Sequence, residues 1–160
     1  MIDMELVGVR IEAPANTPCV LLREQVGDQR ILPIFVGPSE AQAIVLALDG
    51  VVTPRPMTHD LIVNLLRDLG ATLDAVVVTE LREKTFLAEL HLTRAGVVTV
   101  VSCRPSDAIA VAARLGTPIR ASEAVLDVAG IRPPDEDAEQ EEVVEEFREF
   151  IENINPEDFL

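Results

Sequence analysis

The sequence repeats a segment, and this repeat constrains the fold more than any other feature. GPSEAQAIVLALDG at positions 37–50 is followed by the similar RPSDAIAVAARLG at 104–116. A shift of 67 positions superposes the two segments, and it also aligns the apolar runs RILPIFV (30–36) and VVTVVSC (97–103) that precede them. Repetition at a fixed spacing indicates one structural unit that is used twice.

Each copy predicts three strands followed by two helices. Alternating apolar and β-branched residues indicate the strands, and the short breaks between them are typical of hairpins, so each trio should be an antiparallel meander. Pro38 and Pro105 suit the first turn of a helix. Thr58 is expected to cap a second helix that places Leu61, Leu65, Leu66 and Leu69 on one side and ends at Gly70.

The predicted fold is therefore α+β. It is an internal duplication of a three-strand antiparallel meander plus two-helix unit, with halves at about 1–66 and 67–131 related by a pseudo-twofold axis. A chain of 160 residues with 48% hydrophobic content can bury one real core. No apolar run reaches the roughly 18 residues that a membrane span needs, and the N-terminus does not look like a secretory signal, so we expect a cytoplasmic protein.

The net charge of −15 is concentrated at the C-terminal end. Residues 135–160 hold 12 Asp and Glu against one Arg, and paired prolines at 133–134 separate this segment from the rest. We therefore expect a domain over 1–131 and an acidic appendage over 132–160. Apolar residues recur in the appendage at helical spacing, which predicts an amphipathic helix that docks on its own or a neighbouring subunit. An external partner is the alternative.

Three blocks resemble the bifunctional nuclease domain family: LPIFVGPSEAQAIVLALDGV, RPMTHDLIVNLLRDLGA and RPSDAIAVAARLGTPI. They occur in the family's order and extend the resemblance over about residues 3–130. The resemblance implies an α+β domain that is often dimeric, with ribonuclease and deoxyribonuclease activity in some members. Exposed sheet edges favour self-association as well, so we expect a homodimer.

The repeat separates residues shared by both copies from those found in one. At the offset of 64 that applies after the first helix, Arg55, His59 and Asp60 align with an isoleucine, a glutamate and an alanine. As catalytic candidates, His59 can transfer a proton and Asp60 can position water or a metal, while Arg55 can bind phosphate. Alternatively, Asp60 is only the first-turn acid of a helix and His59 a surface residue.

Glu40 and Asp107 occur in both copies, in the first turn of a helix, where a carboxylate is stabilised by the helix dipole. Metal ligation is the alternative role, with Mg²⁺ or Mn²⁺ as the candidate ion. Arg104 replaces Gly37 before the second of these helices, which favours either a bound phosphate or an ion pair with Asp107.

Two functions remain open. The first is a nuclease that hydrolyses phosphodiester bonds in RNA or DNA, and a divalent metal can assist this reaction. The second is a non-catalytic dimeric regulatory or assembly domain that binds a small anion, a nucleotide or a protein. Against nucleic acid, the body is mildly acidic, and the chain lacks Trp and Tyr for base stacking. Catalysis predicts that Arg55, His59, Asp60 and either Glu40 or Asp107 converge in one cleft.

Overall fold

The computed structural model describes residues 1–133 and 148, and within them seven strands and four helices follow one another. The first half comprises β1 (Ile2–Glu12), β2 (Thr17–Glu24), β3 (Ile31–Phe35), α1 (Pro38–Leu48) and α2 (Thr58–Asp68). The second half comprises β4 (Ala71–Arg82), β5 (Thr85–Arg94), β6 (Val97–Cys103), α3 (Pro105–Leu115), β7 (Ile119–Ala121) and α4 (Glu123–Ala129). The α+β class and the three-strand, two-helix order of each half are as predicted, except for β7.

All seven of these strands join one sheet in the order β3-β2-β1-β7-β4-β5-β6. The two predicted meanders are antiparallel, and β7 lies between them, antiparallel to β1 and parallel to β4. The sequence analysis missed β7 because three residues are too few to show an alternating pattern. The internal duplication and its pseudo-twofold axis remain predictions.

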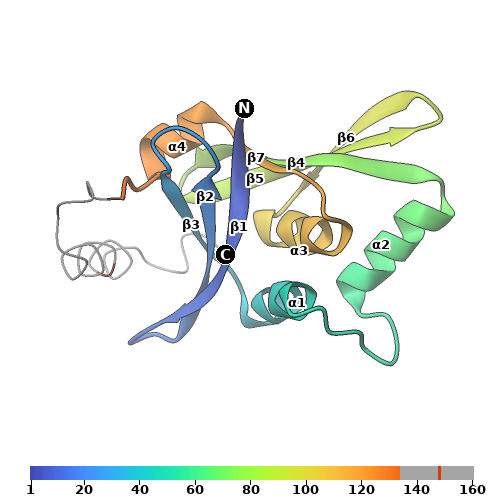
Figure 1. Cartoon of the computed structure of the whole chain (residues 1–160), viewed down its shortest axis with the longest axis horizontal. Coiled ribbons are helices and arrows are strands. Elements are labelled where there is room, and N and C mark those ends of the chain that lie inside the picture. The colour runs from blue at the N-terminus through green and yellow to red at the C-terminus, as the bar shows by residue number, and fades with distance from the viewer. Residues whose placement is uncertain (134–147, 149–160) are drawn as a thin grey trace.

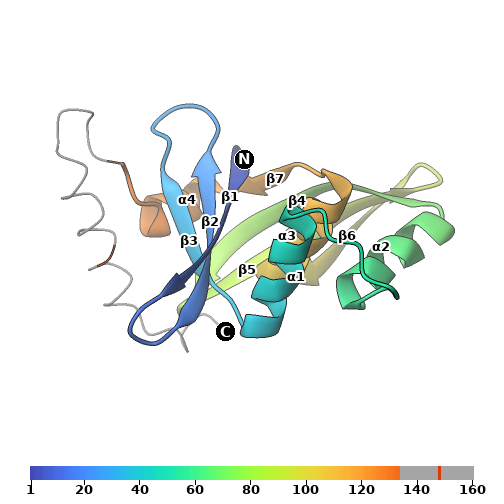
Figure 2. The same cartoon turned by 60° about the horizontal axis from the view of Figure 1, so that its bottom comes forward.

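Helices α1 and α3 pack side by side against the sheet, as both views show (Figures 1 and 2). Helix α3 is the more central of the two, since it contacts α1, α2, β4 and β5. Its residues from Pro105 to Ala112 are buried apart from Asp107. The alanines of α3 permit this close approach, because a methyl side chain lets neighbouring backbones come near. The first turn of α3 is therefore held firmly in the core.

Helix α2 lies at one end of the domain and contacts α3 and β4 with one face (Figure 1). Leu66 packs against the core with Ile62 and Val63. Leu61 and Leu65 of the helix and Leu69 at its C-cap are 52%, 50% and 58% exposed. The prediction that all four leucines lie on one side of the helix is therefore wrong. Leu66 faces the core, and the other three lie on a face that has no partner within the described residues.

A buried ion-pair cluster fastens the β2–β3 hairpin to α4. Arg30 is buried, and its guanidinium donates hydrogen bonds to Glu24, Glu123 and Asp127 at 2.7 to 3.1 Å. The hydrogen bond from Arg30 holds the pKa of the buried Glu24 carboxyl below its usual range. The cluster therefore joins β2 to α4 through the guanidinium of Arg30.

The described domain ends next to β3, where Ile131 forms an antiparallel bridge with Ile31. The predicted amphipathic helix of the acidic appendage lies outside the described residues except for Arg148, so its helicity and docking remain predictions. Among the described residues, no helix is long and apolar enough to cross a membrane.

Candidate active site

Residues of three helices, most of them at or near the helix starts, line one pocket of about 260 Å³. Each turn begins where the chain leaves a strand or loop, and Pro38 and Pro105 occupy the first positions of α1 and α3 as predicted. The lining side chains are Ser39, Glu40, Gln42, Ala43 and Leu46 from α1, Met57, Thr58 and His59 from α2, and Arg104, Asp107 and Arg114 from α3. The starts of α1 and α3 meet at Arg104, and each combines the partial positive charge of a helix N-terminus with a first-turn carboxylate, Glu40 or Asp107.

His59 is buried at 7% exposure, and its ring is fixed by a carboxylate from another helix. The Nε2 atom lies 2.9 Å from Oδ1 of Asp107. Among the described residues, Nδ1 of His59 makes no hydrogen bond. Every fully buried side-chain nitrogen or oxygen of these residues has a hydrogen-bond partner. Nδ1 is therefore not fully buried and contacts solvent. When Nε2 carries the proton and donates it to Asp107, the Nδ1 lone pair is free to act as a base.

Asp107 is a shared acceptor. Besides His59, it accepts hydrogen bonds from Arg104, at 2.9 Å from Nε and 3.2 Å from Nη2. Burial acts to raise the pKa of the Asp107 carboxyl, but the hydrogen bonds from Arg104 and His59 outweigh it, and the pKa lies below its ordinary value. Asp107 is therefore ionised at neutral pH and stabilises a positive charge on either neighbour.

Arg104 connects the two helix starts that carry the acidic residues. Its Nη2 also donates to Oε1 of Glu40 at 3.1 Å, so the guanidinium bridges α1 and α3. The ion pair of Arg104 with Asp107, one of the two alternatives for this residue, is present. The side chain of Arg104 is 62% exposed, and its Nη1 has no hydrogen-bond partner among the described residues. This atom remains able to bind an anion, so the phosphate role also stays open.

Asp60 points to a different partner. Its Oδ2 accepts the backbone N–H of Met57 at 3.0 Å, and its Oδ1 accepts Nε of Arg114 at 2.7 Å. Met57, not Thr58, is the N-cap residue of α2, so the predicted Thr58 cap is wrong, and Asp60 provides the first-turn carboxylate instead. The hydrogen bonds from Arg114 and Met57 hold the pKa of Asp60 below its usual range. Both oxygens are thus engaged in orienting α2.

Arg114 was missed by the sequence analysis. It lies in the last turn of α3, where a cation next to a helix C-terminus is an ordinary feature and gives no functional signal. Its Nη1 donates to the carbonyls of Ala43 in α1 and Ala110 in α3, at 3.0 and 2.8 Å. Together with the bond to Asp60, these contacts join α1, α2 and α3 at the pocket wall.

Arg55 lies apart from the other candidates. It is exposed in the loop before α2 and lines a neighbouring open hollow with Thr53, Pro54, Pro56, Met57 and Leu61. Met57 borders both hollows. The structure therefore brings together His59, Glu40, Asp107 and Arg104, places Asp60 behind them on Arg114, and leaves Arg55 outside the pocket.

The residues of the pocket do not fit a divalent metal. Across residues 1–133 and 148, no group of three or more His, Cys, Asp and Glu side chains is arranged to hold a metal ion. Glu40 and Asp107, the proposed ligands, both bind the guanidinium of Arg104. The guanidinium of Arg104 thus occupies the position between Glu40 and Asp107 that a metal bound by both carboxylates would need.

The amino-acid sequence around this pocket matches a known protein family. The family model of the bifunctional nuclease domain matches residues 20–134, which include every residue of the pocket. The chain belongs to the bifunctional nuclease domain family. The resemblance noted in the three sequence blocks is thus confirmed.

The chain is similar to proteins of two kinds, a mycobacterial protein and plant bifunctional nucleases. The uncharacterized protein Rv1829 of Mycobacterium tuberculosis is 47% identical over 163 residues, which cover 98% of this chain and 97% of the relative. Bifunctional nuclease 2 of Oryza sativa subsp. japonica is 29% identical over 128 residues, or 78% of this chain and 39% of that protein. Bifunctional nuclease 1 of Arabidopsis thaliana is 26% identical over 121 residues, or 74% and 37%.

Proposed function

We propose that the chain is a nuclease that hydrolyses phosphodiester bonds in RNA or DNA at the pocket between α1, α2 and α3. The observation that carries this proposal is His59, buried, oriented by Asp107 and open to solvent at Nδ1, beside the partly free guanidinium of Arg104. A general base and a phosphate-binding cation each contribute to hydrolysis of a phosphodiester. Membership of the bifunctional nuclease domain family and the names of its plant relatives support the same reaction.

The proposed steps use residues of this chain alone. Nη1 of Arg104 and the N-termini of α1 and α3 bind the phosphate oxygens. Nδ1 of His59 takes a proton from water while the water oxygen forms a bond to phosphorus. The bond from phosphorus to the leaving sugar oxygen breaks, and the imidazolium returns the proton to that oxygen. Asp107 stabilises the imidazolium between these two transfers.

Asp60 has a positioning role in this proposal, not a role in proton transfer. Its two oxygens bind Met57 and Arg114, so its effect on His59 acts through the orientation of α2. In this proposal Arg55 contacts a phosphate beyond the pocket, and the border that the two hollows share at Met57 supports this role. An Arg55→Ala variant should therefore weaken binding of an oligonucleotide more than binding of a dinucleotide.

No step is assigned to Mg²⁺ or Mn²⁺, because the candidate ligands are paired with Arg104. Activity should accordingly persist when a chelator is added. Loss of activity with chelator, restored by either ion, would return Glu40 and Asp107 to the role of metal ligands.

The test is a cleavage assay on highly purified protein with labelled single-stranded RNA and DNA. The chain has two histidines, and both bind a carboxylate: His59 binds Asp107, and His91 on β5 binds Glu89 at 3.0 Å. His91→Ala is thus a matched control. We expect His59→Ala to lower kcat/KM at least ~100-fold, the scale of losing a general base, and His91→Ala to leave it unchanged.

Equal activity of the wild type and both folded variants would assign the cleavage to a contaminant. In that case the pocket would be that of a non-catalytic domain binding a small anion, a nucleotide or a protein. The starts of α1 and α3 beside Arg104 support that second function, because a helix N-terminus and a guanidinium attract an anion whether or not it reacts. Phosphate binding that requires Arg104 but is indifferent to His59 would support it.

A further inference from the structure

An open hollow lies beside the pocket of His59, and the proposed reaction uses little of it. The hollow has a volume of about 760 Å³ and is lined by Thr53, Pro54, Arg55, Pro56, Met57 and Leu61. Two prolines, a methionine and a leucine make most of this lining apolar, and all four are exposed. Pockets that hold small organic groups typically span roughly 300–1,000 Å³ and are mainly apolar. The hollow therefore has the size and the lining of a site for such a group.

The loop that forms the hollow is ordered by contacts of its own. Oγ1 of Thr53 donates a hydrogen bond to the carbonyl oxygen of Arg55 at 2.7 Å, which closes a short turn. The rings of Pro54 and Pro56 restrict the backbone on both sides of Arg55. A surface that is already ordered loses little conformational entropy when a ligand binds to it. This loop is therefore suited to binding a ligand without rearrangement.

Met57 is the wall that the hollow shares with the pocket of His59. Its backbone N–H donates to Asp60 at 3.0 Å, and its carbonyl oxygen accepts the N–H of Leu61 at 2.8 Å. Leu61 therefore lies one helical turn beyond Met57 on the same face, and it lines the hollow but not the pocket. His59 lines the pocket but not the hollow. A ligand bound at His59 thus has the hollow as its neighbouring space.

The cation of the hollow is able to bind an anion. Arg104 and Arg114, which line the pocket of His59, form ion pairs with Asp107 and Asp60. The side chain of Arg55, in contrast, is exposed and makes no hydrogen bond or ion pair within the described part of the chain. An unpaired guanidinium next to an apolar surface favours a ligand that has both a negative charge and apolar faces. A nucleotide combines the two, whereas an apolar protein side chain would leave the guanidinium without a partner.

We propose that the hollow binds the nucleobase next to the cleaved phosphodiester, and that the protein therefore acts on single-stranded nucleic acid. This inference rests on the proposed function, since it takes the phosphodiester to lie in the pocket of His59. Proline, methionine and leucine are side chains that proteins place against the faces of unstacked bases. A base in the hollow has left its stack and its pairing partner, and separating it from them costs free energy in a duplex but little in a single strand. Arg55 then binds the phosphate that follows this base.

The test is the affinity of the full chain for a dinucleotide whose linkage is a hydrolysis-resistant phosphorothioate, measured by titration calorimetry. Two further probes each lack one of the two bases and keep the sugar and the linkage. We expect removal of one particular base to weaken binding to the wild type about 5-fold or more, because that base occupies the hollow. A duplex with phosphorothioate linkages should bind at least about 10-fold more weakly than either of its separated strands.

Two leucines of α2 provide a matched pair of variants. Leu61 and Leu65 are 52% and 50% exposed, but only Leu61 lines the hollow. Leu61→Ala should weaken binding of the intact dinucleotide about 5-fold, because the base covers part of the three carbons that the substitution removes. It should not change the affinity for the probe that lacks this base, since the lost contact needs both groups. Leu65→Ala should change neither affinity.

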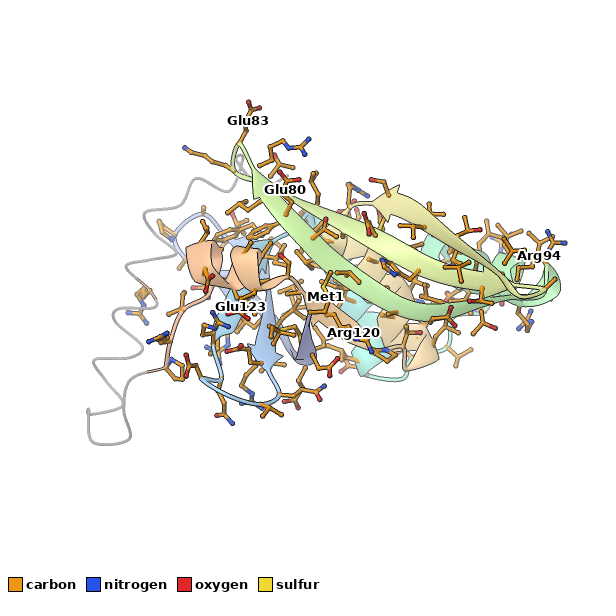
Figure 3. All side chains as sticks on the ribbon, turned by 90° about the horizontal axis from the view of Figure 1, so that it is seen from above. Met1, Glu80, Glu83, Arg94, Arg120 and Glu123 are labelled. Carbon is orange, nitrogen blue, oxygen red and sulfur yellow. The ribbon has the colours of Figure 1, made fainter. Side chains whose placement is uncertain are left out.

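A trinucleotide with two phosphorothioate linkages tests the place of Arg55. Arg55→Ala should weaken its binding about 5-fold and leave binding of the dinucleotide, which has one linkage, unchanged. Arg94→Ala is the matched control, because Arg94 is also exposed and makes no ion pair among the described residues. It lies at one end of the β4–β5 ribbon, opposite to Glu83 (Figure 3), and its loss should affect neither probe.

Equal affinities of Leu61→Ala and Leu65→Ala for the intact dinucleotide would overturn the proposal. So would a loss in Leu61→Ala that is the same with and without the base, a duplex that binds as tightly as its single strands, or a wild type that binds no dinucleotide. The proposed cleavage is judged separately, by His59→Ala in the cleavage assay. A wild type that cleaves nothing, but binds the dinucleotide with the expected dependence on Leu61 and on one base, would refute the nuclease and retain the base site.

Discussion

Replacing Arg114 with methionine should loosen the junction of three helices while leaving their cores packed. Methionine keeps the apolar stem of this side chain, which is 11% exposed, and removes three hydrogen bonds. The bond to Asp60 is counted at about 1 kcal/mol, because a third of that carboxylate is exposed. The bonds to the carbonyls of Ala43 and Ala110 add up to about 1 kcal/mol each. The free energy of unfolding should fall by about 2 to 3 kcal/mol.

Urea unfolding measures this loss as a lower midpoint with an unchanged slope. Arg67→Met is the matched control, since Arg67 on α2 is 68% exposed and pairs only with Asp68 among the described residues; its effect should stay within about 0.5 kcal/mol. A double-mutant cycle of Arg114→Met with Asp60→Asn should give a coupling of about 1 kcal/mol. If Arg114→Met behaves like Arg67→Met, the junction does not hold α2 in place.

The same pair predicts a pH dependence. The pKa of Asp60 is lowered in the folded protein, chiefly by the hydrogen bond from Arg114, so its value lies below the unfolded value of about 3.9. The stability that Asp60 contributes is complete above that unfolded value and is lost as the pH falls through the folded pKa. The difference in stability between wild type and Asp60→Asn should therefore be constant near neutral pH and shrink below about pH 4.

Three further predictions concern other parts of the chain. Arg30→Met should lower the free energy of unfolding, measured in urea, by about 3 to 5 kcal/mol, because it removes the charge partner of the buried Glu24 carboxylate. Arg23→Met, which removes an exposed ion pair, should change this free energy little, and equal effects of the two variants would contradict the buried cluster. Burial raises the pKa of Cys103 to about 11 and that of Cys19 to about 12, so both thiols should react slowly with a thiol reagent at pH 8 and rapidly in urea; fast reaction of the folded chain would refute this. Removal of residues 135–160 should lower stability and dimerisation if the appendage docks, and should tighten oligonucleotide binding at low salt if its charge competes for the pocket; no change in stability would exclude docking.

The sequence was sufficient to predict the two trios of strands and the helices that follow them, because periodicity and proline positions are local signals. Two β-meanders and the helices that follow Pro38 and Pro105 were found in this way. Strand β7 was not predicted, since three residues are too few to show an alternating pattern and its pairing with β1 and β4 depends on long-range contacts. The exposed leucines of α2 show the same limit, because a helix pattern does not tell which apolar face has a partner.

The candidate site was found in part. Comparing the two copies singled out His59, and the first-turn acids indicated Asp107, but their contact joins residues 48 positions apart on different helices. The sequence could therefore not show which carboxylate contacts the histidine. It predicts Asp60 as a residue that positions water or a metal, whereas the structure pairs Asp60 with Arg114. Arg114 gave no signal at all, because its importance arises only from the packing of α3 between α1 and α2.

The most direct test of the pocket uses nitrogen NMR of the imidazoles, since the chain contains two histidines and their signals can be told apart with His91→Ala. The probe is a dinucleotide whose linkage is a hydrolysis-resistant phosphorothioate. We predict that His59 is protonated at Nε2, and that its Nδ1 signal shifts on addition of the probe while the signals of His91 stay constant. A contaminating nuclease cannot produce this shift. An Nδ1 signal of His59 that does not respond to the probe, or a response confined to His91, would contradict the assignment of the phosphodiester site to this pocket.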